Sequence, residues 1–304
     1  MKKTIKDWII AIRPWSLTAS AMPALLAISF VFCNRHTFDA PVSWGYGVLA
    51  LLGAVIFQTS GNLLNDYFDY IYKVDRDNSY SSRSLVDGIF TPRTIYIYGL
   101  LMGVVGSAIG LFLLYSTGLH LLWIGILGIL GAYFYNRMKY IALGDFVIFI
   151  IYGLLIALGV AYVMTGVLLW NIFWISSSSG LLIVGILHAN NTRDMRNDGV
   201  ANIKTQAMAM GVELSKKYFV CLMIGAYFVL LFAVLFRVVH PISFAASLFT
   251  LPITLKLIKQ MNAVHIDTLD TIKTLTESVA QLVLLFSVLL AFANFVVGYF
   301  NLTM

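Results

Sequence analysis

The stretch GNLLNDYFDY, residues 61–70, decides what kind of protein this chain forms. It closes an apolar run over residues 44–66 that is long enough to cross a bilayer, and it places amides and carboxylates at the end of that run. A charge beside a membrane core is costly unless it is paired, so the carboxylates here need a cationic partner. A second polar stretch, HANNTRDMRND over residues 188–198, follows another apolar run. We expect the two clusters to share one site.

The composition places the chain among integral membrane proteins. Of its 304 residues 60% are hydrophobic and 11% are charged, and the mean hydropathy is +0.87. The net charge of +6 does not indicate a nucleic-acid partner, because the charges lie in short segments between apolar runs, as membrane-orientation signals do. Cys33 and Cys221 lie in different apolar runs and form neither a disulfide framework nor a metal-binding pair. The sequence indicates no protein partner.

Nine apolar runs approach the length of about 20 residues that a membrane-spanning helix needs. They cover residues 16–33, 44–66, 95–116, 119–136, 146–166, 170–188, 217–237, 242–258 and 277–300. We therefore predict an all-α fold with nine transmembrane helices, forming a single domain over residues 1–304.

The charges predict how these helices are oriented. With nine spans, all of the 20 basic residues except Arg35 and Arg237 fall on one side of the membrane. Lysine and arginine are enriched in cytoplasmic loops, so we expect a cytoplasmic N-terminus and an outer C-terminus in the cytoplasmic membrane. Of the 14 acidic residues only Asp39 lies on the outer side. The polar clusters are thus expected at the cytoplasmic face.

The first polar cluster has the spacing of a cation site. On a helix Asn62, Asp66 and Asp69 occupy positions i, i+4 and i+7, and Asn65 lies four residues before Asp69, so their oxygens share a face. Such donors suit Mg²⁺, which keeps several waters and binds through one or two carboxylates together with substrate phosphates. A solvated helix end would have a similar composition, but acidic groups at a helix C-terminus oppose the helix dipole.

The second cluster repeats this pattern. Asn190, Asp194 and Asp198 recur every four residues, and Arg193 and Arg196 flank them with groups that can bind phosphate oxygens. A lone DxxxD spacing is common on exposed helices and is weak evidence. Paired with the first cluster, it predicts two carboxylate sets that hold Mg²⁺ on either side of a diphosphate.

Further candidates lie between and beside the clusters. Tyr135 and Lys139 are spaced i, i+4, so a phenol and an ammonium point the same way. They could contact phosphate and an allylic cation, or they could be an interfacial aromatic and a snorkelling lysine. Arg83 has the same two interpretations. His188 is more typical of a packed, hydrogen-bonded histidine than of a base.

These motifs resemble those of the UbiA superfamily of intramembrane aromatic prenyltransferases. The likeness covers most of the chain through RPWSLTAS at 13–20, NDYFD at 65–69, YxxxK at 135–139, KYIALGD at 139–145 and NNTRDxxxD at 190–198. The chain is most similar to the branch that prenylates 1,4-dihydroxy-2-naphthoate or related naphthoquinols in menaquinone biosynthesis. Asp75 follows Asn65 by ten residues as in that branch, and the Asn-Asn-x-Arg-Asp form is also similar to it.

The resemblance implies nine helices around a central cavity, a cytoplasmic active site and a lateral opening to lipid for a polyprenyl tail. It implies that Mg²⁺ and diphosphate are held by Asn65, Asp69, Asp75, Asp194 and Asp198. It also implies diphosphate contacts from Tyr135, Lys139 and Arg193, with Arg83 matching an arginine after the first motif. The cluster residues Asn62, Asp66, Asn190 and Asn191 complete the expected substrate-binding set. The chain departs from the family pattern at Lys73 and Asn202, where Gly is usual, and at Asp145, where many members have Glu.

The expected function is a Mg²⁺-dependent transfer of a polyprenyl group from its diphosphate to the naphthoate, with loss of CO₂ and diphosphate. Asp69, Asp194, Lys139 and Tyr135 are the expected catalytic residues, and His188, Asp66 and Asp145 are candidate bases for the acceptor. Alternatives are another aromatic acceptor, such as 4-hydroxybenzoate or homogentisate, and a cation-coupled transporter. Transporter sites lie near the bilayer midplane, whereas these acids gather at helix ends.

Overall fold

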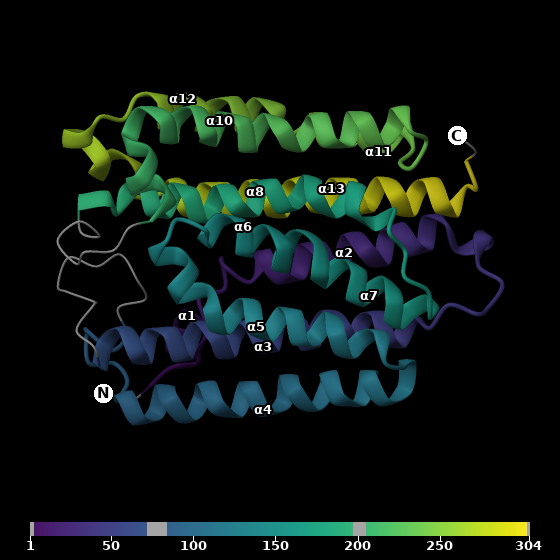
Figure 1. Ribbon diagram of the computed structural model, residues 1–304, viewed down its shortest axis with the longest axis horizontal. Coiled ribbons are helices and arrows are strands. Elements are labelled where there is room, and N and C mark those ends of the chain that lie inside the picture. Colours follow the sequence, from purple (N-terminus) through teal and green to yellow (C-terminus); the bar gives the residue numbers. More distant parts are fainter. Residues whose placement is uncertain (1–2, 72–83, 197–204, 303–304) are drawn as a thin grey trace.

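The chain folds into a bundle of helices that run along its longest axis (Figure 1). The computed structural model describes residues 3–71, 84–196 and 205–302. Within residues 133–140 it leaves the side chains of Tyr133, Asn136, Arg137, Lys139 and Tyr140 undescribed. Every regular element in the described ranges is a helix, which confirms the all-α prediction for that part of the chain.

The α-helices are α1 (Ile5–Ala11), α2 (Thr18–Cys33), α3 (Trp44–Ile71), α4 (Pro92–Thr117), α5 (His120–Tyr140), α6 (Gly144–Ile148), α7 (Ile156–Thr165), α8 (Ile172–Arg193), α10 (Gln206–Leu235), α11 (Pro241–Leu248), α12 (Leu251–Asn262) and α13 (Leu275–Tyr299). A π-helical turn η2 (Phe149–Leu155) joins α6 to α7, and 3₁₀ turns occur at η1 (Arg35–Thr37) and η3 (Ile266–Ile272).

Each of the nine predicted runs falls on a helix, but not every one is a full-length apolar span. In the described residues six helices are long and apolar enough to cross a membrane, and α11 with α12 makes a seventh if that pair, bent by 48°, counts as one. The remaining two predicted runs fall on shorter apolar helices, Thr18–Cys33 and His120–Ala132. The bend follows from Pro252 at the start of α12, since proline cannot donate the hydrogen bond that would continue α11.

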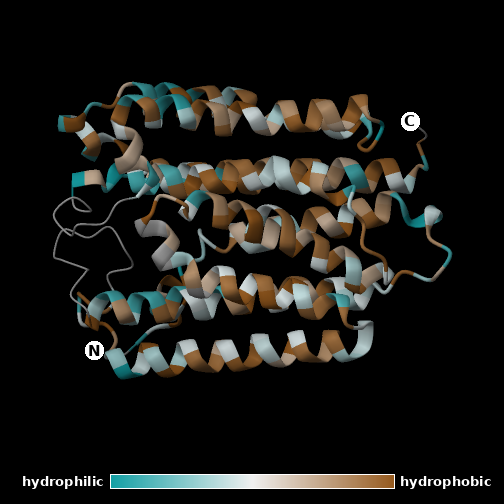
Figure 2. Cartoon of the chain, in the orientation of Figure 1, coloured by the Kyte–Doolittle hydropathy of each residue, from teal (hydrophilic) through white to brown (hydrophobic). Residues whose placement is uncertain are grey.

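Helix α8 lies at the centre of the packing. It contacts α10, α13, α2 and η2, and most of its residues are buried. Helices α3 and α4 pair at one side of the bundle, and α4 presents large apolar side chains such as Val104 and Leu111 outward. An apolar exterior is what a lipid environment requires. Figure 2 shows hydrophilic residues gathered at the left end of α3, α8 and α12.

Two glycines allow η2 and α8 to approach each other closely. A Cβ added to Gly180 would lie 2.6 Å from the Cα of Gly153, and one added to Gly153 would lie 3.1 Å from the Cα of Gly180. Small residues at such crossings let helix backbones pack without a gap, which is a main source of helix association in membranes. The serines at 176–179 precede this crossing, and Ser176, Ser178 and Ser179 are buried.

Replacing Gly180 by alanine should destabilise the bundle, because the new methyl group would meet backbone that cannot move aside. We expect Gly180→Ala to lower the free energy of unfolding by about 1–3 kcal/mol, measured as a lower melting temperature in detergent. Gly125→Ala is the matched control, since no atom lies within 4 Å of its Cβ position. Equal melting temperatures for the two variants would contradict this account of the crossing.

Candidate functional site

The polar clusters come together at one end of the bundle. The C-terminal ends of α3, α5 and α8 all lie at the left in Figure 1, and each of these helices ends in one of the predicted motifs. Of the predicted site residues, Asp75, Arg83 and Asp198 lie outside the described part of the chain. The side chain of Lys139 does too, although the backbone of α5 is described as far as Tyr140.

The first cluster is bound to the segment that precedes α2. Asn62 Nδ2 donates to the carbonyl oxygen of Ile12 at 3.0 Å and to Ser16 Oγ at 2.8 Å. One turn earlier on α3, Gln58 Nε2 donates to the carbonyl oxygen of Ser16 at 2.8 Å. These bonds satisfy backbone carbonyls where the chain turns into α2, and they hold residues 12–16 against the polar face of α3.

The cation paired with Asp66 is Arg13. The Arg13 guanidinium donates to the Asp66 carboxylate in an ion pair, and Asp66 is only 4% exposed. Arg13 has a φ of 54°, in the left-handed region that costs a non-glycine residue energy. The bonds from Asn62 and Asp66 hold the turn in this conformation. Asp66, predicted to bind substrate, thus joins the N-terminal segment to α3.

The other two members of the first cluster lie differently. Asn65 is exposed and Asp69 is half-buried, at the end of α3 that approaches residue 71. Both are more exposed than Asp66, which is buried, and Asn62 is half-buried like Asp69. Within the cluster, Asn62 and Asp66 are the two residues that bind the N-terminal segment.

The second cluster is organised by Arg193. Its Nε and one terminal nitrogen donate to the two carboxylate oxygens of Asp194, each at 2.7 Å, and that terminal nitrogen also donates to Asn190 Oδ1 at 2.7 Å. This two-pronged arrangement is the geometry in which a guanidinium binds a carboxylate or a phosphate. Asp194 caps α8, its backbone N–H bonded to the Asn190 carbonyl. Asn191 is buried, and no described atom bonds to its Oδ1.

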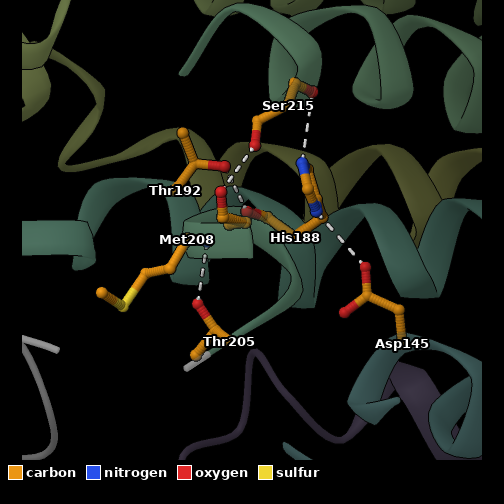
Figure 3. Close-up of polar contacts among 7 residues, drawn as sticks. Asp145, His188, Thr192, Thr205, Met208 and Ser215 are labelled. Atoms are coloured by element: carbon orange, nitrogen blue, oxygen red, sulfur yellow. Dashed lines mark hydrogen bonds and ion pairs between the residues drawn. The ribbon is translucent and has the colours of Figure 1, made fainter. Parts of the chain in front are cut away.

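Beside this cluster lies a buried polar group that joins α6, α8 and α10 (Figure 3). His188 Nδ1 is 3.3 Å from Asp145 Oδ2, and Nε2 is 3.2 Å from the carbonyl oxygen of Ser215. The ring of Tyr218 meets that of His188 edge-on, with centroids 4.8 Å apart. Asp145 and His188 are 1% and 0% exposed. The prediction of a hydrogen-bonded His188 is confirmed.

Arg196 extends the second cluster toward η3. It forms an ion pair with Asp267 at 2.8 Å, and both side chains are largely exposed. An exposed pair of this kind contributes at most about 1 kcal/mol. Arg196 therefore stays available to exchange this partner for another anion.

The described donors suit a magnesium ion in their chemistry. No group of three or more His, Cys, Asp or Glu side chains within the described ranges is arranged to hold a metal. Asn65, Asp69 and Asp194 offer oxygen donors at one end of the bundle, and Mg²⁺ typically takes one or two carboxylates together with phosphate and water. The donor set therefore fits Mg²⁺ brought in with a phosphate ligand.

Comparison with known sequences decides the family. A sequence model of the UbiA prenyltransferase family matches residues 20–275. The chain is 33% identical over 266 residues to the UbiA prenyltransferase domain-containing protein 1 of Rattus norvegicus, covering 84% of this chain and 75% of that one. The human protein of the same name is 32% identical with the same coverage. The chain belongs to the UbiA prenyltransferase family.

Solved structures share the UbiA fold with this chain. A UbiA homolog from Archaeoglobus fulgidus, described as bound to GPP and Mg²⁺, has a TM-score of 0.67 at 15% identity, covering 96% of this chain and 99% of that one. A UbiA homolog from Aeropyrum pernix K1 in its apo form has a TM-score of 0.68 at 14% identity, covering 88% and 96%. At these identities the likeness establishes the architecture.

Sequence reasoning for this UbiA chain missed the role of Arg13. It used Arg13 as an orientation signal and as part of the RPWSLTAS motif, and it left the partner of Asp66 open. The available signal was the position of Arg13, a basic residue directly before the first apolar run, where it can reach an acid at the end of the second. The Asp145–His188 contact was likewise not predicted, and it joins residues 43 positions apart.

The Arg13–Asp66 pair should stabilise the N-terminal segment in a way that a double-mutant cycle can measure. Removing one partner leaves the other charge part-buried, so we expect Arg13→Ala and Asp66→Ala each to cost roughly 1–3 kcal/mol, less than for a fully buried pair. The double variant should cost clearly less than the sum. Arg196→Ala with Asp267→Ala is the exposed control cycle, with each change below about 1 kcal/mol. Strict additivity at Arg13 and Asp66 would contradict the pairing.

Proposed function

We propose that this protein transfers a polyprenyl group from polyprenyl diphosphate to 1,4-dihydroxy-2-naphthoate, releasing CO₂ and diphosphate and giving demethylmenaquinol for menaquinone biosynthesis. The observation that carries the proposal is the convergence of the α3 and α8 ends, which brings Asp69 and Asp194 to the same end of a membrane-type UbiA bundle. The ten-residue spacing from Asn65 to Asp75 and the Asn-Asn-x-Arg-Asp motif support the naphthoate as acceptor.

In this proposal Mg²⁺ is held by Asn65, Asp69, Asp75, Asp194 and Asp198. Two structural neighbours from Archaeoglobus fulgidus are described as bound to Mg²⁺ together with GPP or DMAPP, which supports a prenyl diphosphate as donor. When bound, the metal neutralises charge that develops on the departing diphosphate.

Arg193 would then exchange partners. Its guanidinium holds Asp194 and Asn190 in a fork that equally fits two phosphate oxygens. Arrival of the diphosphate offers Arg193 a more highly charged acceptor and frees the oxygens of Asp194. Tyr135, Lys139 and Arg83 would supply further phosphate contacts, and these interactions are strongest on the leaving group.

The apolar bundle serves the carbocation chemistry of the proposed reaction. Water would quench an allylic cation, and burial among packed helices excludes it. Aromatic rings at the end of α3, such as Tyr67 and Phe68, and the ring of Tyr135 on α5 can stabilise the cation through their faces.

We further propose that the chain is one domain in the cytoplasmic membrane, with its N-terminus and active site inside and its C-terminus outside. In this arrangement α2, α5 and the bent α11–α12 pair complete a set of nine spans around a central cavity that opens laterally to lipid. The distribution of basic residues supports the orientation, and helices at all nine predicted runs support the count.

Removing a carboxylate from either cluster should abolish prenyl transfer. We expect Asp69→Asn and Asp194→Asn to lower turnover of labelled farnesyl diphosphate by at least roughly a hundredfold, since each removes charge complementary to the bound metal. Asp39→Asn, in an exposed segment away from the site, is the matched control and should keep its activity. EDTA should inhibit the wild type and Mg²⁺ should restore it. Near-normal turnover by a folded Asp69 or Asp194 variant would contradict the proposed two-cluster metal site. Activity that EDTA does not change would contradict it as well.

The acceptor can be identified by the fate of its carboxyl group. Incubating membranes with farnesyl diphosphate and carboxyl-labelled 1,4-dihydroxy-2-naphthoate should release labelled CO₂ in step with prenylated product. Decarboxylation should follow because attack at the carboxyl-bearing carbon makes that carbon tetrahedral. The ring becomes aromatic again only when this carbon loses CO₂. Parallel incubations with 4-hydroxybenzoate and homogentisate serve as controls. If one of these compounds gives product and the naphthoate gives none, that compound is the acceptor in place of the naphthoate. If none of the three compounds gives product, transferase activity on these aromatic rings is contradicted.

A further inference from the structure

The buried contact between Asp145 and His188 has a defined proton count. The carbonyl oxygen of Ser215 can only accept a hydrogen bond, so His188 Nε2, 3.2 Å away, must carry a proton. The other ring nitrogen faces Asp145 Oδ2 at 3.3 Å. Two bare acceptors would repel each other there, so one further proton lies between them.

One oxygen of this pair is left over. Asp145 Oδ1 is buried, and no described atom forms a hydrogen bond with it. Figure 3 shows it turned away from His188, whose contact is with the other oxygen. A buried polar atom without a partner costs about 1–3 kcal/mol, so it needs an explanation, and a catalytic role is one that such atoms have. The atom is an acceptor, so it suits a hydrogen-bond donor such as a hydroxyl.

The two other candidate bases are already committed. Asp66 is ion-paired with Arg13 on the side of α3 that holds the N-terminal segment. His188 uses one ring nitrogen for Ser215 and the other for Asp145. Asp145 also follows the YxxxK motif closely, since α6 begins at Gly144, and its contact with α8 places it beside the second cluster.

We propose that Asp145 accepts the proton of the acceptor's ring hydroxyl through Oδ1, and that His188 is a positioning residue that holds the carboxylate for this task. The inference rests on the proposed function, in which the hydroxyl adjoins the carboxyl-bearing carbon. Sharing its other oxygen with His188 keeps Asp145 from rotating, and Ser215 and Tyr218 hold the imidazole in turn.

The step balances with these groups alone. The hydroxyl O–H bond breaks and its proton goes to Asp145 Oδ1, while the oxygen forms a ring C=O. The adjacent ring carbon bonds to the allylic carbon, whose C–O bond breaks with its electron pair leaving on diphosphate. The product is a β-keto carboxylate, which loses CO₂ and returns an electron pair to the ring. The resulting naphtholate oxygen takes the proton back from Asp145, so the residue ends unchanged.

The test is Asp145→Asn in the full-length protein, which keeps the shape of the side chain but cannot take a proton. A general base contributes roughly 10²–10⁴-fold, so we expect kcat to fall at least about a hundredfold. The KM for farnesyl diphosphate and the binding of its thiolo analogue should stay within about threefold of the wild type, because the donor site is intact. Asp145→Glu should recover part of the loss. Ser176→Ala, which removes a buried hydroxyl bonded to the Ile172 carbonyl on the same helix, is the structural control and should keep its kcat.

The outcomes separate this inference from the proposed function. A folded Asp145→Asn protein with kcat within about threefold of the wild type would overturn the role of Asp145 as proton acceptor. Loss of binding of the thiolo analogue together with loss of turnover would overturn it too, because the donor site would then be damaged. If the variant does not fold, the wild type is compared on the naphthoate and on its methyl ether at the hydroxyl beside the carboxyl-bearing carbon. A rate at least about a hundredfold lower on the ether supports the proton transfer, and similar rates overturn it. A wild type that prenylates only another acceptor overturns the naphthoate, and Asp145 is then tested on that ring's hydroxyl.

Discussion

The structure depends on one constraint, which is that a charge at the end of an apolar bundle needs a partner. In the described residues this is met by pairs: Arg13 with Asp66, Arg193 with Asp194, and His188 with Asp145. Two of these pairs join segments that are 53 and 43 residues apart in sequence. Neutralising the charges therefore also fixes how the N-terminal segment, α3, α6 and α8 meet.

The pairs differ in what they leave available. Asp66 is held against the N-terminal segment and serves the fold. Arg193 holds a carboxylate through two parallel bonds, and in the proposed function it exchanges this partner for a phosphate. Asp145 keeps one oxygen without a described partner. The Arg13–Asp66 pair is thus structural. The Arg193–Asp194 pair, which exchanges partners in the proposed function, and the Asp145–His188 pair, which leaves one oxygen without a described bond, are the ones that suit catalysis.

The rest of the bundle gives these groups their precision. The site residues project from the ends of long helices, and side chains on such elements are held more rigidly than side chains on loops. Helix α8 carries the second cluster and His188, and it packs closely on η2 at Gly153 and Gly180. A shift at that crossing would displace the α8 end and the Arg193 fork with it. Helix packing in the apolar part of the bundle therefore determines the positions of the polar residues at its end.

The sequence by itself determined the membrane class, the position of the helices, the two polar clusters and the residues that share a helical face. These features are local, because hydropathy and four-residue spacing involve neighbours along the chain. Which cation pairs with which acid was decided only by the tertiary structure, since several arginines and lysines could serve equally by composition. The selection of Arg13 for Asp66 and of Asp145 for His188, and the shorter apolar lengths of α2 and α5, depend on how helices distant in sequence pack. Opposite charges attract without regard to sequence position, so only the fold could choose among them.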